Sequence, residues 1–378
     1  MAPVMLRPLI LALLVASTGC RELLGIDENV KFDAAPFGLG RFHSCALRAN
    51  GAVVCWGVNS VSQLGDGTAP TERLLPTENG VAAIAVAAGE FHSCALLDGG
   101  AVTCWGDNVH GQLGTGDVMA RPLPTMILPS SEIVELAAGN EHTCARLASG
   151  RVMCTGFEYA AGATVDRLTF ELIGGIDDAV QLAAGSAFTC ALRATKQVSC
   201  WGANFFGMLG NTGPNSTVPE MIPNLDDVTA VAAGNNHACA LHASGHVSCW
   251  GRNRDGNLGD NTLVDSPTPV SVLEISGAIE IDAGDFFSCA RVGAAEIRCW
   301  GTNQAYELGN PSADPTRSLQ PVPVLGLPEL KSFSTGGSHS CALTVAGKLM
   351  CWGANMYGQL GDNTETSRPT PIAVDQYP

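Results

Sequence analysis

The sequence has few basic residues. Its 378 residues include 20 Lys and Arg against 36 Asp and Glu, which gives a formal net charge of −16, and only 15% of residues are charged. A protein that binds nucleic acid through its phosphates needs a basic surface, so we expect no nucleic-acid partner. The 46% of apolar residues exclude a disordered chain. The 44 glycines argue against a coiled coil or a helical bundle.

Long apolar runs are also missing, apart from a short one near the N-terminus. Residues 9–16 are wholly apolar but too few to span a bilayer as a permanent helix, and Arg7 is the only charge in residues 1–20. A short positive start, a short apolar stretch and small residues are typical of an export signal. With Gly19 before Cys20, the segment resembles the bacterial lipoprotein signal, whose cysteine is lipidated and becomes the N-terminus. The alternative is an ordinary secretory signal with an incidental cysteine.

This resemblance implies three parts of the chain. Residues 1–19 are expected to be the signal peptide, residues 20–36 a lipidated N-terminus and tether, and residues 37–378 the folded domain. Acyl chains on Cys20 would hold the protein on a bilayer without spanning it. Arg21, in place of Asp, favours the outer membrane or cell surface of a bacterial envelope.

The other fourteen cysteines form seven pairs, and the two members of every pair are ten positions apart. The first members recur at intervals of 46 to 52 residues. The pairs are Cys45 with Cys55, Cys94 with Cys104, Cys144 with Cys154, Cys190 with Cys200, Cys239 with Cys249, Cys289 with Cys299, and Cys341 with Cys351. A period held over seven copies is the signature of a repeat architecture.

Each copy contains about four short apolar segments separated by glycine-rich turns, with no sustained helical period. Proline-rich stretches such as residues 267–270 and 321–324 join one copy to the next, and they suit outer edge strands. Seven such copies predict an all-β fold, a seven-bladed β-propeller of four-stranded blades.

The cysteine spacing fits a hairpin. Glycine stands six residues after the first cysteine in five copies, for example Gly100 after Cys94. A three-residue loop needs a left-handed residue at its third position. A loop at 98–100 then places Cys94 opposite Cys104, with Cα atoms about 4.5 Å apart, within disulfide range. We therefore predict seven disulfides, one inside each blade, which requires an oxidising compartment.

The second copy shows the repeat clearly, with Gly89, His92, Trp105-Gly106, Asn108 and the segment 111–114, Gly-Gln-Leu-Gly. This pattern resembles the repeat of the regulator-of-chromosome-condensation family, and the resemblance runs from about Phe37 to the C-terminus. It implies a seven-bladed propeller whose ring is closed by joining the N- and C-terminal segments in one blade. Residues 368–374 would then supply a strand missing before Phe37. The third copy departs, because Thr155 replaces the tryptophan and the Gly-Gln-Leu-Gly segment is absent.

Three kinds of recurring residue have a functional and a structural interpretation. His43, His92, His142, His237 and His339 precede the first cysteine by two positions and suggest zinc, but Phe188 and Phe287 take that position elsewhere. We therefore expect buried rings bonded to turn backbone. The six tryptophans after the second cysteines could bind sugars but are expected in the core. Asp66, Asp260 and Asp362 suggest calcium but are expected to stabilise turns.

No nucleophile elbow, phosphate loop or dinucleotide fingerprint is present, so we predict no catalytic residue, metal or cofactor. The expected function is an envelope-anchored scaffold that binds a protein or another surface ligand. Alternatives are an extracellular enzyme inhibitor of the propeller type and, less favoured, a guanine-nucleotide exchange factor or a glycan-active enzyme. Candidate binding residues vary between copies and follow Trp-Gly, so they are expected to share one face: His110, Phe205, Phe206, Arg252, Arg254, Tyr306, Met356 and Tyr357.

Overall fold

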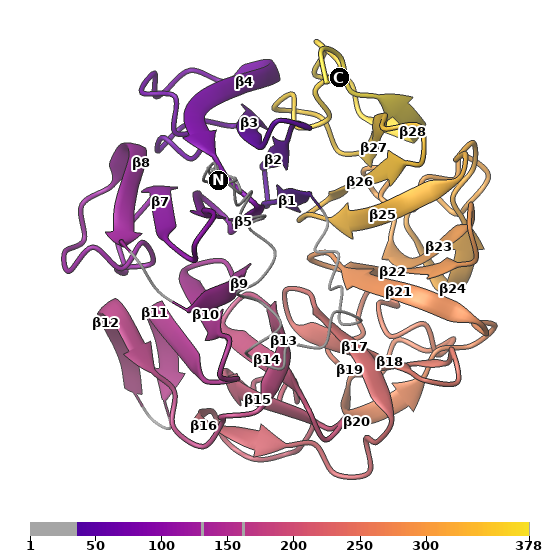
Figure 1. The fold of residues 1–378 in the computed structure, drawn as a ribbon. Helices are drawn as coiled ribbons and strands as arrows, with labels where there is room; N and C mark the ends of the chain where they lie inside the picture. The colour runs from indigo at the N-terminus through magenta and orange to yellow at the C-terminus, as the bar shows by residue number, and fades with distance from the viewer. Residues whose placement is uncertain (1–35, 130–131, 161–162, 378) are drawn as a thin grey trace, which may run out of the picture. The chain divides into compact units, whose positions relative to one another are not determined.

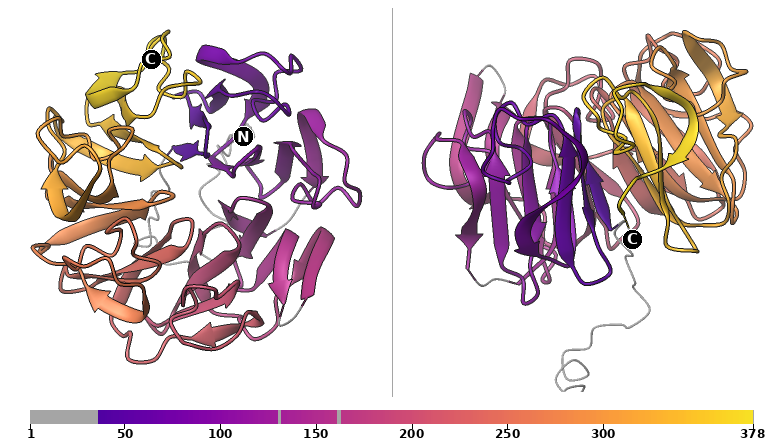
Figure 2. Two further views of the ribbon diagram at one scale, coloured as in Figure 1. Left: turned by 180° about the vertical axis from the view of Figure 1, so that it is seen from behind. Right: turned by 90° about the horizontal axis from the view of Figure 1, so that it is seen from above.

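The computed structural model describes residues 36–129, 132–160 and 163–377, and these residues contain 28 β-strands in seven four-stranded antiparallel sheets. The predicted signal peptide, Cys20 and the tether up to residue 35 lie outside the described residues. Within the described part, no helix is long and apolar enough to cross a membrane. Figures 1 and 2 show the sheets set around a common axis, which confirms the seven-bladed propeller.

Every blade is built from four strands that follow one another in the chain. The first strands, nearest the axis, are β1 (Phe37–Leu39), β5 (Ala85–Ala88), β9 (Ile133–Ala138), β13 (Ala179–Ala184), β17 (Val228–Ala233), β21 (Ala278–Ala283) and β25 (Leu330–Thr335). The second strands are β2 (His43–Leu47), β6 (His92–Leu96), β10 (His142–Leu147), β14 (Phe188–Arg193), β18 (His237–His242), β22 (Phe287–Val292) and β26 (His339–Thr344).

The third strands are β3 (Ala52–Gly57), β7 (Val102–Gly106), β11 (Val152–Ala160), β15 (Val198–Gly202), β19 (Val247–Gly251), β23 (Ile297–Thr302) and β27 (Leu349–Gly353). The outer strands are β4 (Arg73–Ala82), β8 (Arg121–Leu128), β12 (Ala163–Leu172), β16 (Ser216–Met221), β20 (Ser266–Ser271), β24 (Arg317–Pro323) and β28 (Arg368–Ala373). The predicted proline-rich edge strands are β20 and β24. Proline is tolerated there because an outer strand has no further neighbour to which it must donate.

The hairpin between the second and third strands has the predicted register. Gly100 has the expected left-handed backbone, with a φ of 81°, and Cys94 lies opposite Cys104. Lys196 takes the equivalent position in blade 4 with a φ of 64°, and blade 6 places the left-handed residue earlier, at Gly293. The loop of fixed length therefore sets the same pairing even where glycine is absent from its third position.

All seven predicted cysteine pairs lie directly opposite each other and are bonded, with Cα atoms 4.0–4.1 Å apart. The disulfides join Cys45 with Cys55, Cys94 with Cys104, Cys144 with Cys154, Cys190 with Cys200, Cys239 with Cys249, Cys289 with Cys299, and Cys341 with Cys351. Each bond links the second strand of a blade to its third strand. The separation is slightly shorter than the 4.5 Å expected for such a pair.

The third blade is closed differently from the others, as its sequence suggested. Strands β11 and β12 continue as one hairpin, in which Gly156 pairs with Arg167 and Tyr159 with Thr164. In the other blades, a compact Gly-Gln-Leu-Gly type of turn lies between the third and fourth strands. The long hairpin replaces that turn, so the described residues of blade 3 include no such turn at the boundary with blade 4.

The two chain ends do not share a blade, so the predicted joining of the N- and C-terminal segments in one blade is wrong. Strand β28 pairs with β27 in the seventh blade, and β1 completes the first blade by pairing with β2. Residues 37–39 already provide the inner strand, so blade 1 has no vacant position for residues 368–374. The ring is closed by contacts between blades 7 and 1. The Tyr377 hydroxyl donates to the carbonyl of Leu47 (2.7 Å), and Ser44 hydrogen-bonds to His339 (2.8 Å).

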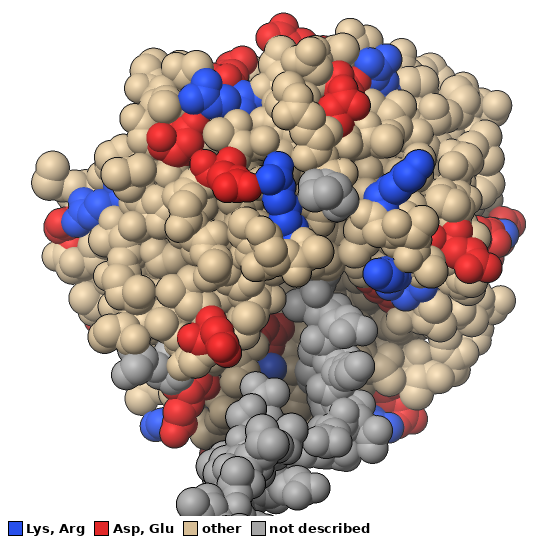
Figure 3. Space-filling view, turned by 45° about the horizontal axis from the view of Figure 1, so that its top comes forward, with Lys and Arg blue, Asp and Glu red and all other residues tan. Residues whose placement is uncertain are grey.

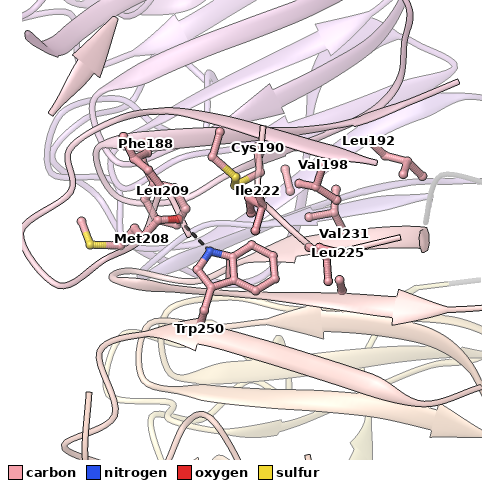
Figure 4. Packing of buried hydrophobic residues seen from close by; sticks show 14 of the residues in the cluster. Phe188, Cys190, Leu192, Val198, Met208, Leu209, Ile222, Leu225, Val231 and Trp250 are labelled. Carbon is pink, nitrogen blue, oxygen red and sulfur yellow. Dashed lines mark hydrogen bonds between the residues drawn. A yellow bond between two sulfur atoms is a disulfide. The ribbon is translucent and has the colours of Figure 1, made fainter. Parts of the chain in front are cut away.

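The core consists of apolar clusters between successive blades, and the tryptophans lie at its centre. Figure 4 shows Trp250 of blade 5 packed against Leu209 and the Cys190 disulfide of blade 4, with its indole N–H donating to the carbonyl of Met208 (2.8 Å). Trp56, Trp105, Trp300 and Trp352 make the same bond to the preceding blade. The core interpretation of the tryptophans is therefore confirmed.

Candidate interaction face

One face of the ring carries two sets of loops. Neighbouring strands are antiparallel, so the loop after the first strand and the loop after the third strand leave each blade at the same end. We call this end the loop face. The hairpins that follow the second strands and the links to the next blade lie at the opposite end.

The loops after the first strands form a closed circle of backbone hydrogen bonds around the axis. The amide of the second loop residue donates to a carbonyl in the same loop of the next blade, at 3.1–3.3 Å. The seven donors are Arg41, Glu90, Asn140, Ser186, Asn235, Asp285 and Gly337. The last bond, from Gly337 to Gly40, joins blade 7 to blade 1.

A glycine opens every loop of this circle because a side chain would not fit there. A Cβ atom on Gly185 would lie 2.6 Å from the carbonyl oxygen of Gly234 and would also overlap the ring of Phe188. Equivalent glycines face the His or Phe ring of their own blade and the next loop, and they include Gly40, Gly139, Gly234, Gly284 and Gly336. The close approach of adjacent loops therefore depends on glycine.

The five repeat histidines are buried, as expected, but their bonding differs from the prediction. Each Nε2 atom bonds to a side-chain hydroxyl of the next blade rather than to turn backbone. His92 contacts Thr143 at 2.8 Å, for example, and His43 contacts Ser93 at 2.8 Å. The Ser93 hydroxyl donates to the carbonyl of Gln63 (3.0 Å), so it accepts from His43 Nε2–H.

Burial keeps these rings neutral. It lowers the pKa of His43, His92, His237 and His339 to about 3, and that of His142 to about 4. Their Nδ1 atoms have no hydrogen-bond partner among the described residues. No group of three or more His, Cys, Asp or Glu in the described part of the chain is arranged to hold a metal ion. The histidines therefore connect neighbouring blades.

The aspartates near the Leu-Gly segments stabilise turns, as predicted. Asp66 accepts from the Thr68 amide (3.0 Å) and from the Asn59 side chain (3.1 Å), and Asp260 and Asp362 make the same pair of contacts. The repeat asparagines thereby hold each loop after the third strand in one shape. The variable residues of that loop are therefore attached to a segment whose conformation these hydrogen bonds fix.

The structure places the candidate residues of blades 2 and 4 in the loops after the third strands, on the loop face. The ring of His110 lies 4.9 Å from that of Phe157, and its Nδ1 atom is 3.2 Å from Asp166. Phe205 is 61% exposed, whereas Phe206 is half-buried and packs against the core. Phe205 therefore offers more of its ring to a partner than Phe206 does.

The candidate residues of blades 5, 6 and 7 occupy equivalent loops. Arg252 lies over the ring of Phe286 at 4.8 Å, and Arg254 lies over Phe206 at 5.9 Å. Both therefore connect to the neighbouring blade. Tyr306 and Met356 are exposed, and Tyr357 is half-buried.

Aromatic residues missed by the sequence analysis join these loops together. Phe42 contacts both Phe91 (5.7 Å) and Tyr357 (5.5 Å), which connects blades 7, 1 and 2. Tyr159 contacts Phe157 (4.8 Å) and Phe205 (5.2 Å), which connects blades 3 and 4. The position before the repeat histidine held a usable signal, because it varies between copies and is Phe in three of them.

Charge on the loop face is paired. Arg41 contacts Glu90 (2.6 Å) and Asp285 (3.1 Å) in two other blades, and burial raises the pKa of the Asp285 carboxyl. Glu141 lies 3.8 Å from His110, and burial raises its pKa as well. Figure 3 shows one side of the molecule, on which acidic and basic side chains lie in small groups among uncharged residues. On the loop face, aromatic rings such as those of Phe42 and Phe205 lie among these paired charges.

Comparison with known proteins places this repeat in a family. The model of the RCC1-like domain matches residues 26–329, and models of the regulator of chromosome condensation (RCC1) repeat match residues 330–359 and 346–376. The chain belongs to the RCC1-like family. Curated relatives match this RCC1-like propeller over short stretches only. A mitochondrial RCC1 domain-containing protein of Arabidopsis thaliana, RUG3, is 35% identical over 72 residues, which cover 18% of this chain and 16% of that protein.

The human probable E3 ubiquitin-protein ligase HERC4 is 44% identical over 48 residues, 13% of this chain and 4% of that protein. Among solved structures, Prp20p of Saccharomyces cerevisiae is similar with a TM-score of 0.78, 23% identity and 87% coverage of both chains. Human WBSCR16 has a TM-score of 0.72 and 21% identity, over 82% of this chain and 86% of that one. At these identities the structures support the shared fold alone.

Proposed function

We propose that this RCC1-like propeller is an exported scaffold, anchored in the cell envelope, that binds a partner protein or another surface ligand through its loop face. The observation that carries this proposal is the exposure of large apolar side chains on rigid loops. Val109, Phe205, Tyr306 and Met356 are 42–68% exposed in the loops after the third strands of four blades. Exposed apolar residues also lie on strands, such as Leu123 in β8 and Ile279 in β21, but these four share one end of the ring. They also stand on loops whose conformation the repeat asparagines fix.

The chemistry of the face favours a protein partner. Aromatic, Met and Arg side chains are the residues enriched at protein interfaces. The rings of Tyr159 and Phe205 are already in contact with each other, so binding would immobilise few free side chains. An inhibitor of an extracellular enzyme is the second candidate, because an exposed phenylalanine ring such as that of Phe205 suits an apolar cleft on a partner. Nucleotide exchange and glycan cleavage remain less favoured.

Affinity capture from intact envelopes tests the binding role. The immobilised propeller should retain a specific protein, and the double variant Phe205→Ala/Met356→Ala should retain at least tenfold less. The matched control is Ile84→Ala/Val345→Ala, since both residues are similarly exposed but lie in the link and hairpin at the opposite end. Equal loss with both double variants, or loss with neither, would argue against the loop face. A captured hydrolase whose activity falls would favour inhibition.

Export and anchoring rest on different observations. Seven disulfides fit an oxidising environment outside the cytosol. The Gly19-Cys20 pair supports acylation at Cys20. Radiolabelled palmitate should enter the wild-type protein and not Cys20→Ser, and the variant should leave the membrane fraction. Equal labelling of both proteins would refute lipidation at this residue.

A further inference from the structure

The boundary between blades 3 and 4 has a pocket where the other boundaries have a loop. The pocket has an empty volume of about 310 Å³, part of it open to solvent. It is lined by both cysteines of the blade 3 disulfide, by Phe157, and by Thr189 and Trp201 of blade 4. This is the place that the missing Gly-Gln-Leu-Gly segment of blade 3 would have reached.

The complete boundaries show what this place is built to hold. Where blade 1 meets blade 2, the carbonyl oxygen of Gln63 accepts from the Trp105 indole (2.8 Å) and from the Ser93 hydroxyl (3.0 Å). Where blade 5 meets blade 6, Asn257 accepts from Trp300 and Ser288 in the same way, at 2.9 and 3.1 Å. Two donors from one blade thus converge on a single carbonyl from the preceding blade.

The residue after that carbonyl is leucine, and its side chain is fully buried. Leu64 packs with the Cys45–Cys55 sulfurs and Trp105, and Leu258 packs with the corresponding disulfide and tryptophan between blades 5 and 6. The turn therefore offers two features together: a backbone oxygen for the two donors and an aliphatic side chain for the disulfide and the indole.

Blade 4 keeps both donors although blade 3 supplies no carbonyl. Trp201 is 3% exposed, and its indole N–H makes no hydrogen bond to a carbonyl of blade 3 within the described residues. This N–H is not one of the buried polar atoms without a partner, so solvent in the pocket reaches it. The Thr189 hydroxyl accepts from His142 (2.8 Å), and the only acceptor near it in the described part of the chain is the Cys144 sulfur at 3.6 Å, which is a weak one. Cys154 is 7% exposed, whereas the other disulfide sulfurs belong to residues at most 1% exposed.

We propose that this pocket receives a turn of the partner protein that presents a backbone carbonyl followed by a leucine-sized aliphatic side chain. The carbonyl oxygen accepts from Trp201 and Thr189, and the aliphatic side chain covers the Cys144–Cys154 disulfide. The turn thereby completes the boundary in the way that the chain's own loops complete the others. The incoming carbonyl takes the place of solvent at the Trp201 N–H, and it gives the Thr189 hydroxyl a stronger acceptor than the Cys144 sulfur.

The pocket lining includes Ala187 and Gly202, which lie at the loop-face end of blade 4, and Phe157, whose ring contacts that of Tyr159. The inference therefore rests on the proposed function and adds a specificity site to it. A partner that lies on the exposed aromatic residues is placed to insert one turn between blades 3 and 4. The Arg167–Glu158 ion pair (2.7 Å), which also lines the pocket, supplies polar groups for the rest of that turn.

Indole NMR tests this directly, because the protein has six tryptophans. The probe is an 11-residue peptide with the sequence of residues 107–117, which contains Gly-Gln-Leu-Gly, and the control peptide has glycine in place of its leucine. In the ¹⁵N-labelled protein, the probe should shift the Trp201 indole signal to saturation and leave the other five unchanged. The control peptide should shift it at least tenfold less at equal concentration.

A pair of matched variants removes one hydroxyl donor inside the pocket and one outside it. Thr189→Val removes the hydroxyl that donates to the incoming carbonyl, and it should weaken peptide binding about fivefold. Thr143→Val breaks the equivalent bond to His92 at the boundary of blades 2 and 3 and should leave the shift intact. Trp201→Phe assigns the signal; should it not fold, the signal is the one that Thr189→Val perturbs without peptide, because Thr189 lies directly opposite Trp201.

The proposal is overturned if the Trp201 signal stays unchanged at millimolar peptide, or if Thr189→Val binds the peptide as the wild type does. The assay needs no partner protein. A negative result here together with specific capture by the loop face would leave the scaffold function standing and refute only the pocket. Peptide binding without any captured protein would support the pocket and argue against the scaffold function.

Discussion

At the scale of single residues, the repeat histidines show how one position can accept two chemistries. Either a His or a Phe ring occupies the same buried position in each of the seven blades. In five of them a histidine adds one hydrogen bond to the next blade, and in the other two a phenylalanine packs there without that bond. The position therefore selects a flat ring that fits beside the loop glycine, and a neutral imidazole meets that requirement.

This arrangement makes stability depend on pH. The folded pKa of about 3 to 4 lies below the ordinary value of 6.5, so the stability associated with each neutral ring is fully present above pH 6.5 and is lost as the pH falls toward the folded pKa. Each histidine should contribute a decrease in unfolding free energy of up to about 1.4 kcal/mol per pH unit below 6.5.

Denaturant unfolding at pH 7.5 and 5.0 measures the effect. His237→Phe copies the residue of blades 4 and 6, so it should unfold with a smaller difference between the two pH values than the wild type. His246→Gln changes an exposed histidine in the hairpin at the opposite end of blade 5 and should keep the full difference. The same pH dependence in the wild type and His237→Phe would contradict the role assigned to the buried ring.

At the scale of elements, the features that repeat from blade to blade could be predicted from the sequence. The spacing of Cys94 and Cys104 with Gly100 between them predicted the hairpin register, because a short loop of fixed length leaves the strands only one pairing. Contacts between repeats could not be predicted in the same way. The partner of His92 lies 51 residues away, and nothing local in the sequence shows that Thr143 faces it. The aromatic contacts of Phe42 were missed for the same reason.

The blade 3 hairpin gives a testable difference among the seven disulfides. Cys154 is partly exposed in the pocket, whereas Cys239 and Cys249 are at most 1% exposed. Thiol–disulfide exchange requires access of the attacking thiolate to sulfur. Under limiting dithiothreitol at neutral pH, the Cys144–Cys154 bond should therefore be reduced first.

Alkylation followed by mass spectrometry of the peptides identifies the reduced pair. The Cys239–Cys249 bond, whose cysteines are at most 1% exposed, is the internal control. Simultaneous reduction of all seven bonds would show that global unfolding, rather than the open boundary, controls access. Loss of any one bond should cost at most about 2–3 kcal/mol, because each closes a loop of about eleven residues.

At the scale of the whole molecule, ring closure was the feature least open to prediction. The ring can close through one blade built from both chain ends, or through contacts between two complete blades, 7 and 1. Both arrangements give the same pattern of repeats in the sequence. The difference depends on whether residues 37–39 pair with β2, which is a matter of three residues. The structure shows that the seven boundaries form one closed circle of backbone bonds, so no blade is terminal.

A closed circle should make unfolding a property of the entire ring. In an open array, stability is a sum of neighbouring terms and the ends unfold first, but here each blade has two neighbours. Gly185→Ala would push the new Cβ against Gly234 and Phe188, at a cost of about 1–3 kcal/mol for overpacking. Calorimetry should show one transition that moves as a whole to lower temperature.

Gly174→Ala is the control, because its Cβ would meet no atom within 4 Å and its backbone is not left-handed. It should leave the transition within experimental error of the wild type. If Gly185→Ala instead produced a separate early transition while the remainder melted as before, blades 4 and 5 would unfold independently of the ring. The circle of hydrogen bonds would then be a set of local contacts, without the cooperative role that closure predicts.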